Sequence, residues 1–383
     1  MKSPNRPHVL EAAKIAPSRP TAPSAVEQQM LVTLYAQERL KEAEQVAHSL
    51  TQQYPNHPFG WKLLGAILWQ ADRTAEALAP MQKAVALMPT DWEAINNLGS
   101  TLDALGHLDH SEACFRRAIE LKPDAPHVFN NLAELLLKQG HVDEAMDLFR
   151  KKLSLQPDDA YTQQVIAMYT GGQTERAPDQ FVAQTFDFYA DSFDAHLQGK
   201  LGYKAPEQLV AMVAKHLPQP AEKLRVLDLG CGTGLVGLAV APMARELVGV
   251  DLSPKMLEKA REKAVYQRLE CADLLTMMRA EPESAYDLLI AADVFIYLGK
   301  LDEVMVQCKR LLTPGGQLAF TTEVLGEPGQ DYRLNSTGRY THASGYLERL
   351  AKDHGFTPIE SLTTSIRTEA SQPVPSHLLV WRT

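Results

Sequence analysis

The stretch Val226-Leu-Asp-Leu-Gly-Cys-Gly-Thr-Gly234 decides the fold of this chain, because an apolar strand runs there directly into three glycines at alternate positions. Glycine lets the backbone approach a ligand closely, and free N–H groups at a helix start bind polar ligands. The stretch predicts a nucleotide-type binding loop. Gly232, Gly234 and Gly237 also satisfy G-x-G-x-x-G, with Asp251 nineteen residues after Gly232, which leaves a dinucleotide dehydrogenase as the competing interpretation.

Apolar runs alternate with amphipathic segments from Ala205 onward. The runs are LRVLDLG, ELVGVDLS, LECADLL, YDLLIAADV and GQLAFTTE. Such alternation predicts a parallel sheet wrapped by helices. The last two runs, IESLTTSIR and HLLVWR, are joined by a polar loop too short for a helix, so they are predicted to pair antiparallel.

Two features favour a methyltransferase over a dehydrogenase. Asp228 ends the strand two residues before Gly230, where a carboxylate can face an ammonium group but would repel a pyrophosphate. The turn Pro314-Gly315-Gly316 comes before a strand and then the antiparallel pair. Over roughly residues 180 to 383 the sequence resembles the class I S-adenosylmethionine-dependent methyltransferases. The resemblance implies a Rossmann-like, seven-stranded sheet with an antiparallel last strand, with S-adenosylmethionine as cofactor and no metal.

The resemblance also assigns cofactor-binding roles to residues of the loop and of the following strand ends. In the family the acid that ends the second strand bonds both ribose hydroxyls, which here is Asp251. The residues expected to surround the cofactor on this side are Asp228, Gly230, Cys231, Gly232, Gly234, Asp251 and Leu252. Ser253-Pro254 predicts the N-cap and first turn of a helix over 254–263. Met256 on that helix would lie near the adenine, or would be an ordinary buried helix residue.

Two later strand ends complete the predicted cofactor site. Ala272, Asp273 and Leu274 resemble the segment in which an Asp accepts from the adenine amino group, although helix capping is the alternative for Asp273. Asp293 would bind cofactor, orient a substrate, or cap a helix near Gly299. Because Val294 and Phe295 follow it, the segment departs from the Asn/Asp-Pro-Pro-aromatic motif of nucleic-acid amino methyltransferases, which disfavours DNA bases as substrates.

Aromatic residues upstream of the loop are candidates for contacts with the cofactor. The segment Phe186–His196 resembles the lead-in helix that folds as a lid over the cofactor in methyltransferases of small molecules. Tyr189 is its expected contact, and Tyr203 is a second one because a phenol offers an apolar face and a polar tip. For both tyrosines a place in the core is the alternative.

Three polar residues between the fifth parallel strand and the last helix are the catalytic candidates. Arg339, Tyr340 and His342 lie in a segment, residues 332–344, where related enzymes build part of the substrate pocket. A Gly-Arg-Tyr-x-His run is similar to one in predicted methyltransferases that carry tetratricopeptide repeats. His342 or His196 would serve as general base if the acceptor is a hydroxyl or a protonated amine.

The first half of the chain is repetitive. Pro55, Pro89, Pro123 and Pro157 stand 34 residues apart, and each closes an apolar helical segment, which predicts a repeat array of helix pairs. The segments WKLLGAIL, INNLGSTL and FNNLAELL recur in phase, and Ala77, Ser111 and Ala145 follow at the second-helix position. Small residues there let paired helices approach closely.

These positions resemble the tetratricopeptide repeat family, on Trp61, Leu64, Gly65, Ala77 and Pro89, although Leu68 stands where the family usually has Tyr. We therefore expect a disordered leader over 1–24, about four repeats and a capping helix over 25–170, and a methyltransferase domain over 171–383. The resemblance implies a groove that holds a protein or peptide partner. A spacer or oligomerisation module is the alternative.

Composition sets further limits on function. The formal charge of -9 gives no basic field for nucleic acid, and the four cysteines lie too far apart for a zinc or redox motif. No apolar run is long enough for a signal peptide or a membrane span, so we expect a cytoplasmic protein that contacts no membrane. Three hypotheses follow: a methyltransferase whose repeats recruit a protein substrate or partner, a small-molecule O- or N-methyltransferase whose repeats mediate homo-oligomerisation, and an inactive binding scaffold.

Overall fold

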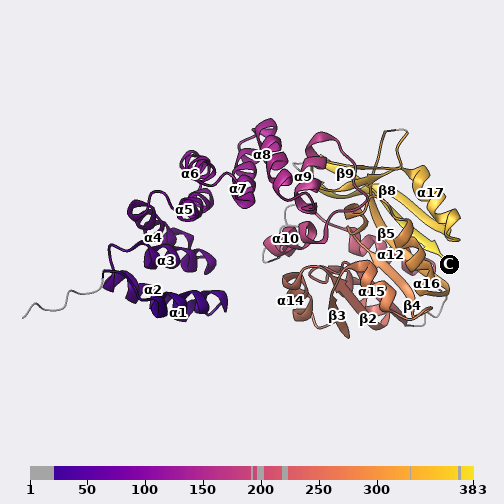
Figure 1. Cartoon of the computed structure of the whole chain (residues 1–383). Coiled ribbons are helices and arrows are strands. Elements are labelled where there is room, and N and C mark those ends of the chain that lie inside the picture. Colours follow the sequence, from indigo (N-terminus) through magenta and orange to yellow (C-terminus); the bar gives the residue numbers. More distant parts are fainter. Residues whose placement is uncertain (1–20, 191–192, 196–201, 218–222, 328, 370–371) are drawn as a thin grey trace, which may run out of the picture. The chain divides into compact units, whose positions relative to one another are not determined.

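The computed structural model describes residues 21–190, 193–195, 202–217, 223–327, 329–369 and 372–383. The chain divides into two compact units, Met1–Gln156 and Pro157–Thr383, whose elements are coloured along the sequence in Figure 1. Over the described residues, no helix has the length and apolar character needed to cross a bilayer.

The first unit consists of helices that follow each other as pairs. Its helices are α1 (Ala25–Ala36), α2 (Leu40–Gln53), α3 (Pro58–Gln70), α4 (Thr74–Leu87), α5 (Trp92–Ala104), α6 (Leu108–Leu121), α7 (Pro126–Lys138) and α8 (Val142–Leu155). The prolines of the 34-residue series come two residues after α2, α4, α6 and α8, which confirms the predicted helix-pair repeat. Ser24, at the end of the expected leader, forms a capping box with Glu27 at the start of α1.

Small residues bring the two helices of each pair together. A Cβ atom added to Gly65 would lie 2.7 Å from the Met81 side chain, and one added to Gly99 would lie 2.7 Å from the Phe115 ring. Ser111 is fully buried, and its hydroxyl donates to the Gly99 carbonyl at 2.8 Å. The predicted close approach at the second-helix position is therefore confirmed.

The second unit is built on one sheet with helices on its faces. Its strands are β1 (Leu224–Leu229), β2 (Ala244–Asp251), β3 (Arg268–Cys271), β4 (Tyr286–Ala291), β5 (Leu312–Val324), β6 (Tyr332–Leu334), β7 (Tyr340–His342), β8 (Thr357–Glu369) and β9 (Gln372–Arg382). Its helices are α9 (Ala160–Thr170), α10 (Asp179–Tyr189), α11 (Phe193–Ala195), α12 (Ala205–Lys215), α13 (Leu235–Val240), α14 (Pro254–Glu262), α15 (Leu274–Ala280), α16 (Asp302–Leu311) and α17 (Ser344–Asp353).

The sheet has the predicted Rossmann-like topology. Strands run in the order β3-β2-β1-β4-β5 with parallel pairing, and β9 joins β5 antiparallel and pairs with β8 antiparallel. These seven strands match the predicted number and direction. The short hairpin of β6 and β7 is added to them, because Glu323 and Val324 at the end of β5 pair with β7.

Alternate residues of each strand enter two different cores, because successive side chains of a strand point to opposite faces. On one face, Leu227 and Leu289 pack with residues of α15, α16 and α17. On the other face, Val226 and Leu288 pack with residues of α12 and α13. Both faces are therefore covered, as expected for a parallel sheet.

The segment that follows α9 is bound to the second unit by its backbone. The Ala177 amide donates to the Tyr297 carbonyl at 2.9 Å, and the amides of Gly299 and Lys300 donate to the Glu175 carbonyl. Ala167 of α9 lies in one apolar cluster with Ala177, Leu334 and Tyr340. The boundary between the two compact units falls before α9, at residue 156, whereas the sequence places the end of the repeat array at residue 170. The latter boundary stays a prediction.

Candidate functional site

A cavity of about 670 Å³ opens at the carboxyl ends of the parallel strands of the second unit. This is where open parallel sheets bind ligands, because the chain leaves the sheet in opposite directions on either side of it. Of the residues predicted to bind cofactor or to act in catalysis, the cavity is lined by Tyr189, Tyr203, Gly230, Cys231, Gly232, Asp251, Leu252, Ala272, Asp273, Leu274, Asp293 and Arg339. The fold therefore brings together, around one cavity, residues that the sequence analysis picked out at the ends of several strands.

The glycine loop after β1 requires glycine for two reasons. Gly230 has φ +62°, and an added Cβ would lie 2.5 Å from Cγ2 of Val294. Gly234 has φ +90° and begins α13, but it lies outside the cavity lining, with the Tyr266 ring next to it. The loop thus brings backbone close both to the cavity and to the segment after β4.

Asp251 ends β2 and is held in place by the loop. One carboxylate oxygen accepts from the Gly232 amide at 2.8 Å, and the other accepts from the Ser253 amide at 2.9 Å. Burial raises the pKa of this carboxyl, while those backbone amides and that of Leu252 oppose the shift. Each oxygen keeps a lone pair that can accept from a hydroxyl in the cavity, so its position fits a ribose diol.

Asp228 lies beneath the loop, fully buried and outside the cavity lining. It accepts a hydrogen bond from the Tyr266 hydroxyl at 2.6 Å, and its Oδ1 atom has no hydrogen-bond partner within the described residues. Burial raises the pKa of Asp228 to about 7. An unsatisfied buried acceptor under a glycine loop is consistent with a cationic ligand group nearby.

The helix after β2 begins as predicted. Ser253 caps α14 by accepting from the Met256 amide, and Pro254 occupies its first turn. The Met256 side chain is fully buried and does not line the cavity. Met256 is therefore an ordinary buried helix residue, which was the alternative to a place near the adenine.

Asp273 both lines the cavity and caps a helix. Its Oδ1 accepts from the amide and hydroxyl of Thr276 at the start of α15, each at 3.0 Å. Its Oδ2 accepts from Arg176 at 2.8 Å, and the hydrogen bond and charge of Arg176 hold the pKa of Asp273 below its usual value against the effect of burial. Sequence analysis missed Arg176, because it lies 97 residues before Asp273 in the chain and no local motif links the two.

Aromatic side chains from α10 and its surroundings form an apolar wall of the cavity. Phe186 and Phe193 meet edge to face, and Phe186 also contacts Tyr297. Tyr189 lines the cavity with about half of its side chain exposed. Burial raises the pKa of Tyr203 well above its usual value, so this phenol stays protonated. His196, the second candidate base, lies outside the described residues.

Asp293 follows β4 with a backbone in the left-handed region, at φ +58°. Its amide donates to Thr321 Oγ1 at 2.8 Å, and its Oδ2 accepts from Arg367 Nη1 at 2.5 Å. Of the three alternatives for Asp293, the role as helix cap is wrong, because α16 begins only at Asp302 and Leu301 is its N-cap. Non-glycine residues in this conformation are rare and are often found at functional sites.

Tyr340 and His342 are brought near the site but not into it. Both are fully buried in β7, and neither lines the cavity. Tyr340 is hydrogen-bonded to Thr174, and Nε2 of His342 lies 2.9 and 3.1 Å from the carbonyls of Leu298 and Gly299. Burial lowers the pKa of His342 to about 4. This geometry gives no support to the catalytic roles predicted for them.

Comparisons with known proteins agree with both halves of the chain. The model of a methyltransferase domain matches residues 227–318, and the model of the tetratricopeptide repeat matches residues 32–91 and 96–160. Human methyltransferase-like protein 27 is 34% identical over 143 residues, 36% of this chain and 56% of that protein.

Two bacterial relatives match the chain to a similar extent. The ubiquinone biosynthesis O-methyltransferase of Chelativorans sp. is 31% identical and covers 34% of this chain and 55% of its own. The malonyl-[acyl-carrier protein] O-methyltransferase of Legionella pneumophila is 34% identical and covers 37% of this chain and 49% of its own. The chain thus spans about half the length of the curated relatives it matches.

Fold, glycine loop and family matches together define a class I methyltransferase domain, whose cofactor is S-adenosylmethionine. The chain joins this domain to tetratricopeptide repeats that precede it. The residues present fit the cofactor, since Asp251 offers acceptors for a diol, Asp228 has an unsatisfied buried oxygen, and the position of a Cβ on the cavity-lining Gly232 has nothing within 4 Å of it.

Proposed function

We propose that the second unit catalyses transfer of a methyl group from S-adenosylmethionine to an acceptor held in the same cavity. The observation that carries this proposal is Asp251, fixed by two backbone amides at the cavity wall beside the glycine loop. A ribose needs a carboxylate in such a position, because one carboxylate accepts from two neighbouring hydroxyls.

The chain's own residues have mainly a positioning task in this reaction. When bound, S-adenosylmethionine would supply a methyl group bonded to a positively charged sulfur. A lone pair of the acceptor would attack the methyl carbon, and the sulfur would leave as a neutral thioether. Asp251 and Asp273 would fix the two ends of the nucleoside, and the aromatic side chains of α10 would exclude water. A cavity of about 670 Å³ lies in the range of sites for small molecules, which favours a small acceptor or a single side chain.

Calorimetric titration of the full chain with S-adenosylmethionine and S-adenosylhomocysteine tests the proposal. We expect micromolar binding of both, and a loss of about a hundredfold or more in Asp251→Ala, because two charge-assisted hydrogen bonds disappear. Glu246→Ala is the matched control, since this exposed carboxylate lies on the same strand and pairs with Arg225. Absence of binding by the unaltered chain would favour the scaffold hypothesis.

We further propose that the repeat array recruits a protein or peptide partner, as the match to tetratricopeptide repeats suggests, and that the protein acts in the cytoplasm. The alternative use of the repeats is homo-oligomerisation. Analytical ultracentrifugation of the full chain distinguishes them: a monomer at micromolar concentration is expected, and a stable dimer or larger assembly would favour the alternative.

A further inference from the structure

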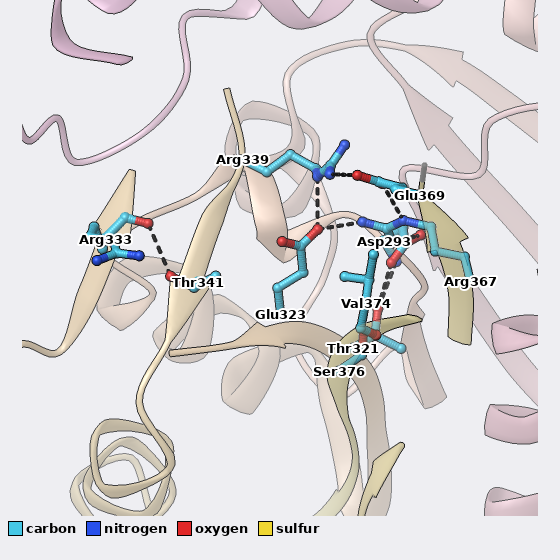
Figure 2. Close-up of polar contacts among 10 residues, drawn as sticks. All are labelled: Asp293, Thr321, Glu323, Arg333, Arg339, Thr341, Arg367, Glu369, Val374 and Ser376. Atoms are coloured by element: carbon cyan, nitrogen blue, oxygen red, sulfur yellow. Dashed lines mark hydrogen bonds and ion pairs between the residues drawn. The ribbon is translucent and has the colours of Figure 1, made fainter. Parts of the chain in front are cut away.

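A closed ring of alternating charges lies at the cavity wall that carries Asp293 (Figure 2). Arg339 donates to Glu323 at 2.7 Å and to Glu369 at 2.5 Å. Arg367 donates to the same two carboxylates, at 2.9 Å to Glu369 and at shorter range to Glu323. Two positive and two negative charges therefore balance within the ring.

Two members of the ring are too well buried for an ordinary surface cluster, whereas Arg339 and Glu369 keep 17% and 32% of their side chains exposed. The side chains of Arg367 and Glu323 are only 4% and 7% exposed. Ion pairs in such surroundings are costly to desolvate and are held only by good geometry, so the ring is a rigid support. It joins Glu323 of β5, Arg339 next to β7, and Arg367 and Glu369 of β8, and thus ties the C-terminal hairpin to the cavity.

Asp293 is a third carboxylate on the two guanidinium groups, so the five groups together carry one excess negative charge. The remaining amino group of Arg367, Nη1, donates to Asp293 Oδ2 at 2.5 Å. The other oxygen, Oδ1, has the Thr321 hydroxyl at 3.4 Å as its partner in the described part of the chain. Because both guanidinium charges are already matched inside the ring, Asp293 gives this wall a net charge of -1 and an oxygen that can still accept a hydrogen bond.

The surroundings of Asp293 are otherwise apolar or neutral. The cavity wall next to it carries Val294, Ile296 and Leu298. Tyr203 and Tyr297 also line the cavity, and burial raises the pKa of both phenols, that of Tyr297 to about 12, so neither adds a charge. In such surroundings a second anion close to Asp293 is strongly repelled, whereas a cation or a neutral donor is attracted.

We propose that Asp293 receives a hydrogen bond from the methyl-accepting group, and that the ring of Arg339, Glu323, Arg367 and Glu369 positions Asp293 for this. The acceptor is then a hydroxyl or an amine on an apolar body, and not a carboxylate. This inference rests on the proposed methyltransferase function and adds the chemical class of the acceptor. It separates this chain from an enzyme that esterifies an acid.

Three small probes of one shape test the inference on the full chain saturated with S-adenosylhomocysteine. They are 2-phenylethylamine, 2-phenylethanol and 3-phenylpropanoate, and their binding is measured by ligand-observed NMR. We expect the amine and the alcohol to bind at least ten times more tightly than the carboxylate. Asp293→Asn should weaken the amine about tenfold and leave the affinity for S-adenosylhomocysteine within twofold. Glu246→Gln, an exposed carboxylate of β2 that does not line the cavity, should change neither.

Glu369→Gln tests the positioning role, because it removes one charge of the ring and leaves Asp293 in place. The preference for the amine over the alcohol should fall at least threefold while the alcohol binds as before; a merely structural role would weaken all three probes equally.

Several results would overturn the inference. They are equal or tighter binding of the carboxylate, an unchanged preference in Asp293→Asn, and no binding of any probe by a protein that binds the cofactor. Loss of S-adenosylhomocysteine affinity in Asp293→Asn would instead assign Asp293 to the cofactor. Failure of the unaltered chain to bind S-adenosylmethionine is a different outcome, which refutes the proposed function itself.

Discussion

The two units of this chain use the same kinds of residue for different purposes. In the repeat unit, glycines make room for neighbouring helices, and charged side chains such as Lys138 and Asp103 pair at the surface. In the sheet unit, a glycine makes room for a ligand loop, and charges such as Asp228 and Arg367 are buried. The glycines of the first unit serve helix packing, whereas the second unit buries charged groups beside its cavity at a cost that a bound ligand would offset.

The largest contrast between the units is expected at glycines with positive φ. Gly230→Ala adds a Cβ within 2.5 Å of Val294 to a backbone at φ +62°, whereas Gly140→Ala in the repeat unit has φ +83° but open space around it. We expect Gly230→Ala to cost about 4 kcal/mol of unfolding free energy and to abolish cofactor binding. Gly140→Ala should cost about 1 kcal/mol and leave binding unchanged.

Urea denaturation and calorimetry of both variants provide the measurement. Equal losses of stability in the two variants would mean that backbone strain alone, and not the approach of Val294, decides the effect at Gly230.

The second contrast concerns pH. Since burial raises the pKa of Asp228 from 3.8 to about 7, the folded state binds a proton that the unfolded state has already released between these values. Asp228 therefore destabilises the fold increasingly as pH rises from about 4 to about 7. Asp228→Asn removes this cost, so its stability relative to the unaltered chain should rise across that window by on the order of 4 kcal/mol and then level off.

Chemical denaturation from pH 4 to pH 8 measures this difference directly. Asp103→Asn in the repeat unit serves as the control for the substitution of a carboxylate by an amide. A difference that does not change with pH would show that Asp228 keeps its charge throughout.

The sequence predicts features that depend on neighbouring residues better than features that depend on residues far apart in the chain. The 34-residue spacing predicts the helix pairs, and the glycine loop and Asp251 predict the cofactor side of the cavity, because these signals are local in the chain. Arg367 and Tyr266 were missed because they meet Asp293 and Asp228 only through the folded sheet, at separations of 74 and 38 residues.

His342 shows the limit of composition as a guide to catalysis. A histidine in a polar segment predicts a base, but whether its ring faces the cavity depends on strand register. In β7 the ring turns to the carbonyls of Leu298 and Gly299. An arginine and a glutamate two residues apart, at Arg367 and Glu369, were the available signal, since this spacing puts both on one face of a strand.

A third, smaller effect is expected between two glycines of the repeat unit. Alanine gains about 1 kcal/mol of helix propensity over glycine, but the new Cβ would lie 2.7 Å from the Phe115 ring in Gly99→Ala and 2.7 Å from Met81 in Gly65→Ala. A flexible methionine can move aside, whereas a buried aromatic ring cannot. Gly65→Ala should be nearly neutral and Gly99→Ala should cost about 2 kcal/mol, as measured by thermal and urea unfolding.

The smallest effect sets a surface ion pair against one beside the ligand loop. In the repeat unit, Lys138 and Asp103 pair with 57% and 20% of their side chains exposed, whereas Lys263 and Asp194 pair with 17% and 36% exposed. Asp194 also accepts from the Thr233 hydroxyl of the glycine loop, so Lys263 helps hold the α11 segment against the loop.

Lys138→Met should change stability by less than about 0.5 kcal/mol. Lys263→Met should speed release of S-adenosylhomocysteine a few-fold in stopped-flow measurements, with little loss of stability. Equal release rates in both variants would mean that the loop holds the ligand without help from α11, and the difference between the units would then lie in their buried charges alone.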